Sequence, residues 1–463
     1  MKTIFTKSIT KALTLVVVIA MTLGALTSCG ILGYIIDGIL PATVGAKDEI
    51  LLEIETTVNE GGKPKETAEE YLRSWSLPKY DRMKFSYVEL CFNQLYNLEG
   101  GLPDTLTHAA ETAKLFIEHY YDIIDHDDKT AVTDALLYCY VHVVGDPYSV
   151  YRPPVESESF NDEMSGSFGG IGVVVEYNHN EESIMISTVY PDSPAEKAGL
   201  KVGDYIYAVD GRTVEELGYT NAVYYVRGEI GTTVDVTVLR DGKLVTCTAT
   251  RERVEEINVD YEFDPETKMA YIYILSFKEN TFSQFKESVD KVLELGAEGI
   301  VFDLRNNPGG YVQSVLDVVS YLVPSGHTIL SYQYKGRDQV FIESYDDIDG
   351  VDHVVDLPMV VLCNEYTASS GEIFTSAIRD FRDAGLIDAM LVGTNTFGKG
   401  IMQSSYYYTD GSTITLTVSY FNPPCGVNYH GTGIAPDLEL ELSESEDNQL
   451  KAAYEQLKLL IDN

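Results

Sequence analysis

The chain has 463 residues, of which 33 are Lys or Arg and 72 are Asp or Glu, so its formal net charge is −39 at pH 7. A surface this acidic repels phosphate groups, and we therefore expect no nucleic acid partner. The length exceeds that of a single typical hydrophobic core, which predicts two or three domains.

The first thirty residues have the pattern of an export signal. Three lysines precede an apolar run over residues 12–25, which has signal-peptide length rather than membrane-span length. The run ends in Leu-Thr-Ser-Cys-Gly at residues 26–30, which resembles a bacterial lipobox. The resemblance implies a lipoprotein signal peptide over residues 1–28, with a lipid on the Cys29 thiol that tethers the chain to the cell membrane outside the cytoplasm. An ordinary signal peptide or an uncleaved anchor helix is the alternative.

The remaining cysteines give no sign of a disulfide framework or a zinc site. They are odd in number and widely spaced, without a CxxC pair or a neighbouring histidine pair. We expect most of them to be buried thiols, and we expect neither a metal nor a cofactor. They are Cys91, Cys139, Cys247, Cys363 and Cys425.

A linker and a helical domain follow the signal. Residues 29–75 are mixed and polar with a Gly-Gly break, which is typical of a spacer. Apolar side chains then recur at helical spacing over residues 108–124 and 130–144, and a turn-rich stretch at residues 145–151 ends the pattern. We therefore expect a small N-terminal helical domain over residues 76–155.

Residues 165–253 have the pattern of a small β domain. Strand-type runs surround a short helix that Ser193 caps, with Pro194 as its first residue and Gly199 as its stop. The stretch SPAEKAGLKVGDYIYAVDG at residues 193–211 resembles a PDZ domain of the kind found in bacterial proteases, which implies a barrel-like β fold.

The PDZ resemblance implies a binding loop for a peptide C-terminus. In such domains the peptide adds as a strand, and backbone N–H groups of a glycine-containing loop bind its carboxylate. By position that loop consists of Gly169, Gly170, Ile171 and Gly172. The alternative is a domain that only packs against its neighbours.

Residues 254–445 alternate between strand and helix patterns. Strands are expected over residues 269–274, 299–304, 357–363 and 389–392, with helices over residues 281–295 and 312–322. This alternation predicts a largely parallel sheet whose functional loops follow the carboxyl ends of the strands. Two such loops, residues 305–310 and 365–371, contain glycines and small polar residues. A helical tail over residues 446–463 completes an α+β multidomain chain.

These loops carry the parts of a serine–lysine nucleophile pair. A serine hydroxyl needs a base to attack an amide, and a lysine can serve when burial lowers its pKa from about 10.4 towards 7–8. Lys399 stands between two glycines in an apolar stretch, and Gln403 would orient its amine. The three histidines of this half lie outside any recognisable triad motif. The oxyanion would meet the backbone N–H of Ser370 and one from Gly309 or Gly310.

Together with the PDZ pattern, several motifs resemble the C-terminal processing (tail-specific) peptidases. They are GDPYSVY at residues 145–151, DLRNNPGG at 303–310, NEYTASSGEIF at 364–374, LVGTNTFGKGIMQ at 391–403 and GTGIAPD at 431–437. The family's nucleophile stands three residues before the motif glutamate, here Glu372, which implies Ser369 rather than Ser370. The base and orienting residues then fall on Lys399 and Gln403, in a core of the ClpP/crotonase type.

The chain departs from the family pattern at two places. The family usually has Ser-Ala-Ser across the nucleophile, where this chain has Ala-Ser-Ser at residues 368–370. The segment between residues 379–380 and 391–393 is a few residues longer than in the family, and the extra residues fall within residues 382–388. Their effect on substrate preference is open. The lysine motif is intact, so activity is expected.

The sequence therefore predicts an extracytoplasmic serine endopeptidase that cleaves proteins near accessible C-termini. The alternative is a catalytically silent PDZ scaffold of the cell envelope, which the intact Ser369, Lys399 and Gln403 disfavour. A chymotrypsin-like PDZ protease is rejected, because no GNSGG-type motif precedes the PDZ pattern.

Overall fold

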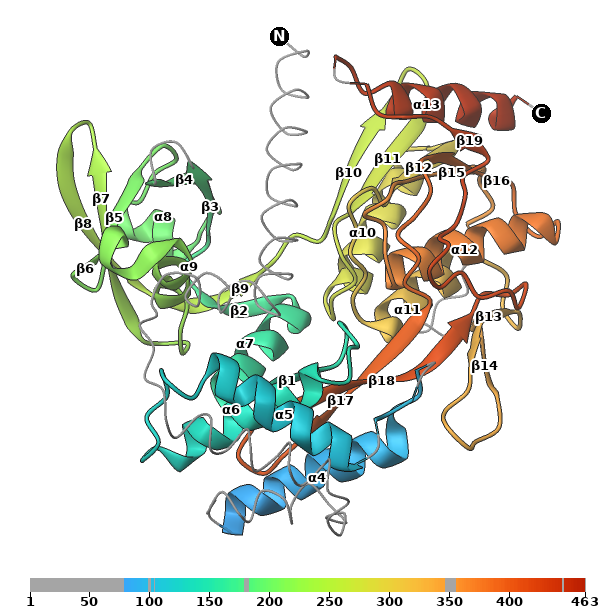
Figure 1. The fold of residues 1–463 in the computed structure, drawn as a ribbon. Helices are drawn as coiled ribbons and strands as arrows, with labels where there is room; N and C mark the ends of the chain where they lie inside the picture. Colours follow the sequence, from blue (N-terminus) through green and yellow to red (C-terminus); the bar gives the residue numbers. More distant parts are fainter. Residues whose placement is uncertain are drawn as a thin grey trace.

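The computed structural model describes residues 79–98, 101–103, 105–178, 183–345, 355–443 and 445–462. The expected signal peptide, Cys29 and the linker over residues 29–75 lie outside the described residues. Among the described helices, none is long and apolar enough to cross a membrane. Three parts are visible in Figure 1: an α/β core, a group of helices below it, and a small β domain to one side.

A six-stranded sheet forms the centre of the α/β core. Its strand order is β10-β11-β12-β15-β16-β19, and all neighbouring pairs are parallel except β10 with β11. The expected parallel sheet is therefore confirmed. The strands are β10 (Val259–Asp264), β11 (Met269–Ile274), β12 (Gly299–Asp303), β15 (Met359–Cys363), β16 (Ala389–Gly393) and β19 (Leu438–Glu439).

Helices cover both faces of this sheet. The helices α10 (Thr281–Glu294), α11 (Val312–Leu322) and α12 (Ser370–Asp383) pack on one face, where Ile300 and Phe302 of β12 join their core. The helix α13 (Asn448–Ile461) packs on the other face against Val301, because successive side chains of a strand point to opposite faces. The four inner strands β11, β12, β15 and β16 are mostly buried and largely apolar, which is why the sequence located them within a residue or two. The edge strands β10 and β19 were not predicted, because they are short or alternate between buried and exposed residues.

The N-terminal helices are present, but they do not form a core of their own. Their buried side chains form one cluster with Ile414, Leu416 and Val418, which lie on β18. Strand β1 also pairs with β18, in a five-stranded sheet that extends the α/β core. The expected helical domain over residues 76–155 is thus a cap built onto the core. The elements are α4 (Lys79–Leu95), α5 (Thr105–His119), α6 (Lys129–His142), β1 (Val150–Arg152), α7 (Pro154–Ser165), β13 (Thr328–Tyr332), β14 (Val340–Glu343), β17 (Ile401–Tyr407) and β18 (Thr413–Asn422).

The small β domain has a sheet of order β3-β4-β5-β7-β8, with β6 paired to β5 and β3 at one edge. The Ser193 hydroxyl accepts from the N–H of Glu196 at 3.2 Å, and Gly199 ends the helix in a left-handed conformation, as the sequence predicts. The elements are β3 (Val173–Asn178), β4 (Ser183–Val189), α8 (Pro194–Ala198), β5 (Tyr205–Val209), β6 (Arg212–Thr213), α9 (Val214–Val226), β7 (Thr233–Arg240) and β8 (Lys243–Thr250).

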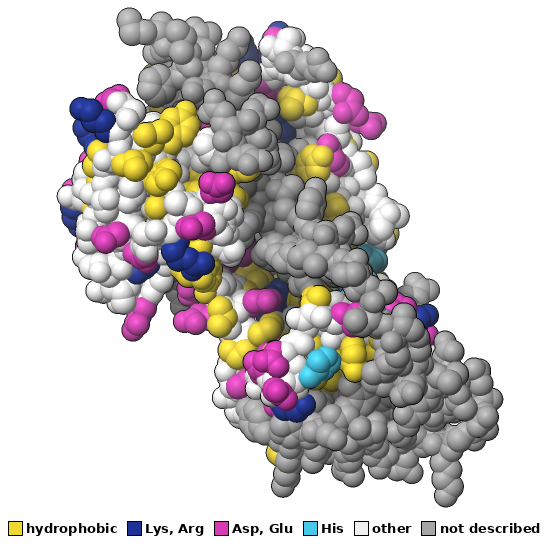
Figure 2. Space-filling view, turned by 60° about the vertical axis from the view of Figure 1, so that its left-hand side comes forward, with side chains coloured by type: hydrophobic (Ala, Val, Ile, Leu, Met, Phe, Trp, Pro, Cys, Tyr) yellow, Lys and Arg dark blue, Asp and Glu magenta, His cyan; other side chains and the backbone are white. Residues whose placement is uncertain are grey.

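Two strands outside that sheet connect the small β domain to the rest of the molecule. They are β2 (Ser167–Gly170) and β9 (Glu252–Glu255), which pair antiparallel as a separate ribbon. We call this pair of strands the stem, and Figure 1 shows it between the small β domain and the core. Acidic side chains are spread over the face shown in Figure 2, in keeping with the net charge of −39.

Candidate active site

The two adjacent serines of the 365–371 loop differ in their environments. Ser369 immediately precedes α12 and has φ 53°, a conformation that costs energy in a residue other than glycine and is often found at functional sites. Ser370 is fully buried, and its hydroxyl donates a hydrogen bond to the carbonyl of Gly310 at 2.9 Å. The hydroxyl of Ser370 thus has a structural partner, whereas Ser369 stands at the strained turn.

The loop after β12 lies directly against this turn. The N–H of Ala368 donates to the carbonyl of Asn307 at 2.9 Å. Gly309 has φ 98°, and a Cβ on it would stand 2.7 Å from Ser369 Cβ and 2.8 Å from the nitrogen of Ser370. Only glycine fits this position. The backbone of residues 309–310 therefore borders the position of the Ser369 side chain.

The backbone N–H groups beside Ser369 differ in whether they are available to bind a ligand. The N–H of Gly309 donates to Oδ1 of Asn307 at 2.9 Å, so a side chain of the same loop already occupies it. The N–H of Gly310 has no hydrogen-bond partner among the described residues. The N–H of Ser370 belongs to the first turn of α12, where helix donors have no intrahelical acceptor. The Ser370 and Gly310 groups are thus free to bind an anion.

Lys399 is held beside the same turn by its neighbours. The N–H of Phe397 donates to the carbonyl of Thr367 at 3.0 Å. Gly398 has φ 91°, and a Cβ on it would stand 2.9 Å from the nitrogen of Gly433, so the 431–437 motif packs against the lysine turn. The Lys399 amine lies 4.6 Å from the centre of the Tyr148 ring, which the 145–151 motif contributes. The helical cap therefore supplies part of this site.

Burial lowers the pKa of Lys399 to about 8, although the carboxylates of Asp146 and Glu372 oppose that change by stabilising the ammonium form. A lysine with this pKa has a substantial neutral fraction slightly above neutral pH, and a neutral amine can accept a proton. The environment that the sequence predicts for this lysine is thus present.

Glu372 joins the serine turn to the lysine turn, a role that the sequence analysis did not assign. One carboxylate oxygen accepts from the N–H groups of Ser369 at 3.0 Å and Lys399 at 2.7 Å. The other accepts from the hydroxyl of Thr396 and the N–H of Gly398, both at 2.6 Å. The Ser-x-x-Glu spacing of a capping box is the signal in the sequence that could have pointed to this role.

Gln403 lies on β17, and its side-chain amide donates to Oγ1 of Thr417 at 3.5 Å. Among the described residues, no hydrogen bond joins the side chains of Ser369, Lys399 and Gln403. Catalytic hydrogen bonds are often long in a protein without substrate and form only in the complex. The structure thus joins the turns that carry Ser369 and Lys399, while their side chains are not bonded to each other.

Two residues of the predicted peptide-binding loop are paired within the stem, and the other two are not. Gly169 and Gly170 belong to β2 and pair with β9 in the stem. Ile171 and Gly172 follow β2, and neither of their N–H groups has a hydrogen-bond partner among the described residues. Their two N–H groups, beside the edge strand β3, are the part of the loop that is available to a carboxylate. The carboxylate role itself stays a prediction.

Two segments of the chain are similar to known protein families. The model of peptidase family S41 matches residues 268–440, and the model of the PDZ domain matches residues 169–250. A probable CtpA-like serine protease of Staphylococcus haemolyticus is 33% identical over 329 residues, which are 70% of this chain and 64% of that relative. The corresponding protein of Staphylococcus aureus strain N315 is 32% identical over 330 residues, with the same coverage.

Among solved structures, a photosystem II D1 C-terminal processing protease aligns with 82% of this chain and 98% of its own length. The two are 22% identical, with a TM-score of 0.46. The chain spans 64% of the length of these curated relatives, which is less than two thirds.

Proposed function

We propose that the chain is a serine endopeptidase of family S41 that cleaves proteins near their C-termini, because the model of that family matches residues 268–440 and the model of the PDZ domain matches residues 169–250. The observation that supports this proposal most is the Glu372 carboxylate, which accepts hydrogen bonds from the N–H groups of both Ser369 and Lys399. It fixes the backbone of a strained serine turn beside that of a lysine with a lowered pKa.

In the proposed reaction, Ser369 Oγ attacks the carbonyl carbon of the scissile peptide bond while the neutral amine of Lys399 takes the hydroxyl proton. The N–H groups of Ser370 and of Gly309 or Gly310 stabilise the oxyanion, and the free N–H of Gly310 makes it the better candidate of the two glycines. The lysine then passes its proton to the leaving amine. Water hydrolyses the acyl-enzyme by the same steps, and Gln403 orients the lysine amine.

The proposed substrates are proteins whose C-termini are accessible, and the PDZ domain docks these tails or gates the site. A tail would add as a strand beside β3, which is an edge strand and offers an unpaired row of backbone groups. The N–H groups of Ile171 and Gly172 would bind the terminal carboxylate.

The proposed location is the outer side of the cell membrane, with the chain tethered by a lipid on Cys29. The support is the sequence alone: the three lysines, the apolar run over residues 12–25 and the lipobox pattern at residues 26–30. Replacement of Cys29 by Ala tests it by fractionation. We expect the variant to leave the membrane fraction or to remain unprocessed, and unchanged fractionation and processing would contradict the anchor.

The activity is tested with an unstructured protein such as casein. We expect the purified protein to cleave it and the Ser369→Ala and Lys399→Ala variants to lose about 10³-fold or more of that activity. We expect Ser370→Ala to retain most of its activity, because the Ser370 hydroxyl is bonded to the carbonyl of Gly310. Equal cleavage by all four proteins would exclude the serine–lysine mechanism. No cleavage by any of them would favour a PDZ scaffold.

A further inference from the structure

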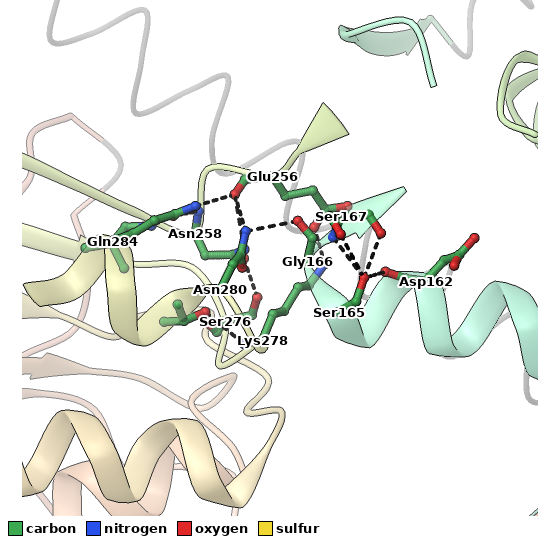
Figure 3. Close-up of polar contacts among 12 residues, drawn as sticks. Asp162, Ser165, Gly166, Ser167, Glu256, Asn258, Ser276, Lys278, Asn280 and Gln284 are labelled. Atoms are coloured by element: carbon green, nitrogen blue, oxygen red, sulfur yellow. Dashed lines mark hydrogen bonds and ion pairs between the residues drawn. The ribbon is translucent and has the colours of Figure 1, made fainter. Parts of the chain in front are cut away.

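One side chain of the α/β core, Asn280, binds the residues that flank both strands of the stem. Its amide group donates to the carbonyl of Gly166, just before β2, at 3.0 Å and to the carbonyl of Glu256, just after β9, at 3.1 Å. Its Oδ1 accepts from the amide of Asn258 at 3.0 Å. Figure 3 shows Asn280 between these groups. Gly166 has φ 69°, and a side chain there would overlap the Asn280 amide, so the contact is close-packed.

Other contacts bind the chain on either side of the stem to the turn before α10 and to α10 itself. The side-chain amide of Gln284 donates to the carbonyl of Glu256 at 2.8 Å, and the N–H of Glu279 donates to the carbonyl of Met164 at 3.2 Å. The Lys278 amine forms a largely buried ion pair with the Glu256 carboxylate. The ends of the stem therefore rest on residues 276–281 of the peptidase core (Figure 3).

Residues 276–281 also contact the loop after β12, residues 305–310, which we call the glycine loop. The N–H of Phe277 donates to the carbonyl of Gly309 at 2.9 Å, and the N–H of Tyr311 donates to the carbonyl of Phe277 at 2.6 Å. The carbonyl and the N–H of a trans peptide point in opposite directions. The bond to the carbonyl of Gly309 therefore fixes the direction of the Gly310 N–H, one of the candidate oxyanion donors.

We propose that Asn280 is a positioning residue, which couples the stem of the PDZ domain to the Gly309–Gly310 peptide through the 276–281 turn. The inference rests on the proposed function, because it assigns the Gly310 N–H to the oxyanion. When the residues that flank the stem are hydrogen-bonded to Asn280, the 276–281 turn holds Phe277 against the glycine loop. Movement of the stem then changes the orientation of the Gly310 N–H, which stabilises the transition state rather than the bound substrate.

The test uses Asn280→Asp in the full-length protein. Asp keeps the size and the Oδ1 acceptor of Asn and favours the start of α10, but it cannot donate to the carbonyls of Gly166 and Glu256. The matched control is Ser165→Ala. The Ser165 hydroxyl donates to the carbonyls of Asp162 and Ser167 within the stem region and does not reach the 276–281 turn.

With casein as substrate, we expect Asn280→Asp to lower kcat about tenfold or more and to leave KM within about twofold. Ser165→Ala should leave both values within about twofold of those of the parent protein. A purely structural role would lower the midpoint of thermal unfolding without this separation of kcat from KM. An unchanged kcat in Asn280→Asp would overturn the inference.

Hydrogen exchange separates a failure of this inference from a failure of the proposed function. The N–H of Tyr311 is bonded to the carbonyl of Phe277, so peptides that contain it report on the contact between the turn and the glycine loop. We expect these peptides to exchange faster in Asn280→Asp and to be unchanged in Ser165→Ala. Unchanged exchange in Asn280→Asp would overturn the coupling even if the parent protein cleaves casein. If the parent protein cleaves casein no faster than Ser369→Ala, the proposed function fails, and the exchange result still decides the coupling.

Discussion

The carboxylate of Glu372 accepts a hydrogen bond from the backbone N–H of Lys399 at 2.7 Å, across 27 residues of sequence. The same oxygen accepts from the N–H of Ser369 at 3.0 Å, so a single atom holds two turns of the candidate site together. Glu372 is fully buried, and all four hydrogen-bond partners of its carboxylate among the described residues are donors. Burial raises the pKa of Glu372, and these four donors oppose the rise.

Replacement of Glu372 by Gln should damage both stability and activity. The Gln side chain places an amide donor against groups that are themselves donors, which leaves buried polar groups without acceptors. We expect the free energy of unfolding to fall by about 2 kcal/mol or more and cleavage of casein to fall about tenfold or more. Chemical denaturation and the casein assay measure the two effects. The matched control is Glu365→Gln in the same loop, whose exposed carboxylate has Thr394 Oγ1, at 3.0 Å, as its one hydrogen-bond partner among the described residues. Equal effects in both variants would contradict the assigned role of Glu372.

Replacement of Gly309 by Ala should abolish most of the activity, because the new Cβ would stand 2.7 Å from Ser369 Cβ. The matched control is Gly326→Ala. Gly326 also has a positive φ, 75°, but its Cβ would meet nothing within 4 Å. Both variants should therefore lose about 1 kcal/mol of stability from backbone strain, and only Gly309→Ala should lose activity, by about a hundredfold or more. An active Gly309→Ala protein would mean that the glycine loop does not border the reacting serine.

Much of the core could be predicted from the sequence because local patterns specify it. The helix over residues 312–322 has the predicted bounds, and the strand predicted over residues 357–363 spans residues 359–363, since helical periodicity and continuous apolar runs are local signals. Local chemistry also specified the cap by Ser193 and the stop at Gly199.

The long-range relationships could not be predicted in this way. The helical cap shares its core with β18, whose partner residues lie more than 250 positions away in sequence. The contact between the Tyr148 ring and the Lys399 amine could not be predicted for the same reason, although the 145–151 motif itself was recognised in the sequence. Glu372 could have been found from the capping-box spacing, but the lysine turn that it also binds comes from outside the helix.

The ion pair between Arg305 and Asp447 should contribute to stability, because it joins the start of the C-terminal helix α13 to the core. The guanidinium of Arg305, the first residue of the glycine loop, donates to both carboxylate oxygens of Asp447 at 2.9 Å. Asp447 also caps α13 by accepting from the N–H of Leu450 at 2.9 Å. We expect Asp447→Ala to lower the free energy of unfolding by about 3 kcal/mol, since it removes a cap and one partner of a buried cation. Asp447→Asn keeps the cap and should recover about 1 kcal/mol of that loss. Identical denaturation curves for the parent protein and Asp447→Ala would contradict this assignment.

The pH dependence of cleavage should follow the protonation of Lys399. Below its pKa of about 8 the amine is protonated and cannot accept the serine proton, so kcat/KM should rise as the pH increases through about 8. The carboxylate of Asp146 stabilises the ammonium form. Its removal in Asp146→Asn should therefore lower the pKa of Lys399 and move the rising limb of the profile to lower pH.

The matched control is Asp241→Asn, which makes the same change of charge at the turn between β7 and β8. Asp241 has φ 50°, a conformation that Asn tolerates, so the control should fold normally. We expect its pH profile to overlay that of the parent protein, measured from about pH 6 to about pH 10 with casein. A flat profile for the parent protein would exclude a lysine base with this pKa. The loss of an anion beside an ammonium group lowers the pKa of that group. A shift of the Asp146→Asn profile to higher pH would therefore show that Asp146 acts on the site by some means other than its charge.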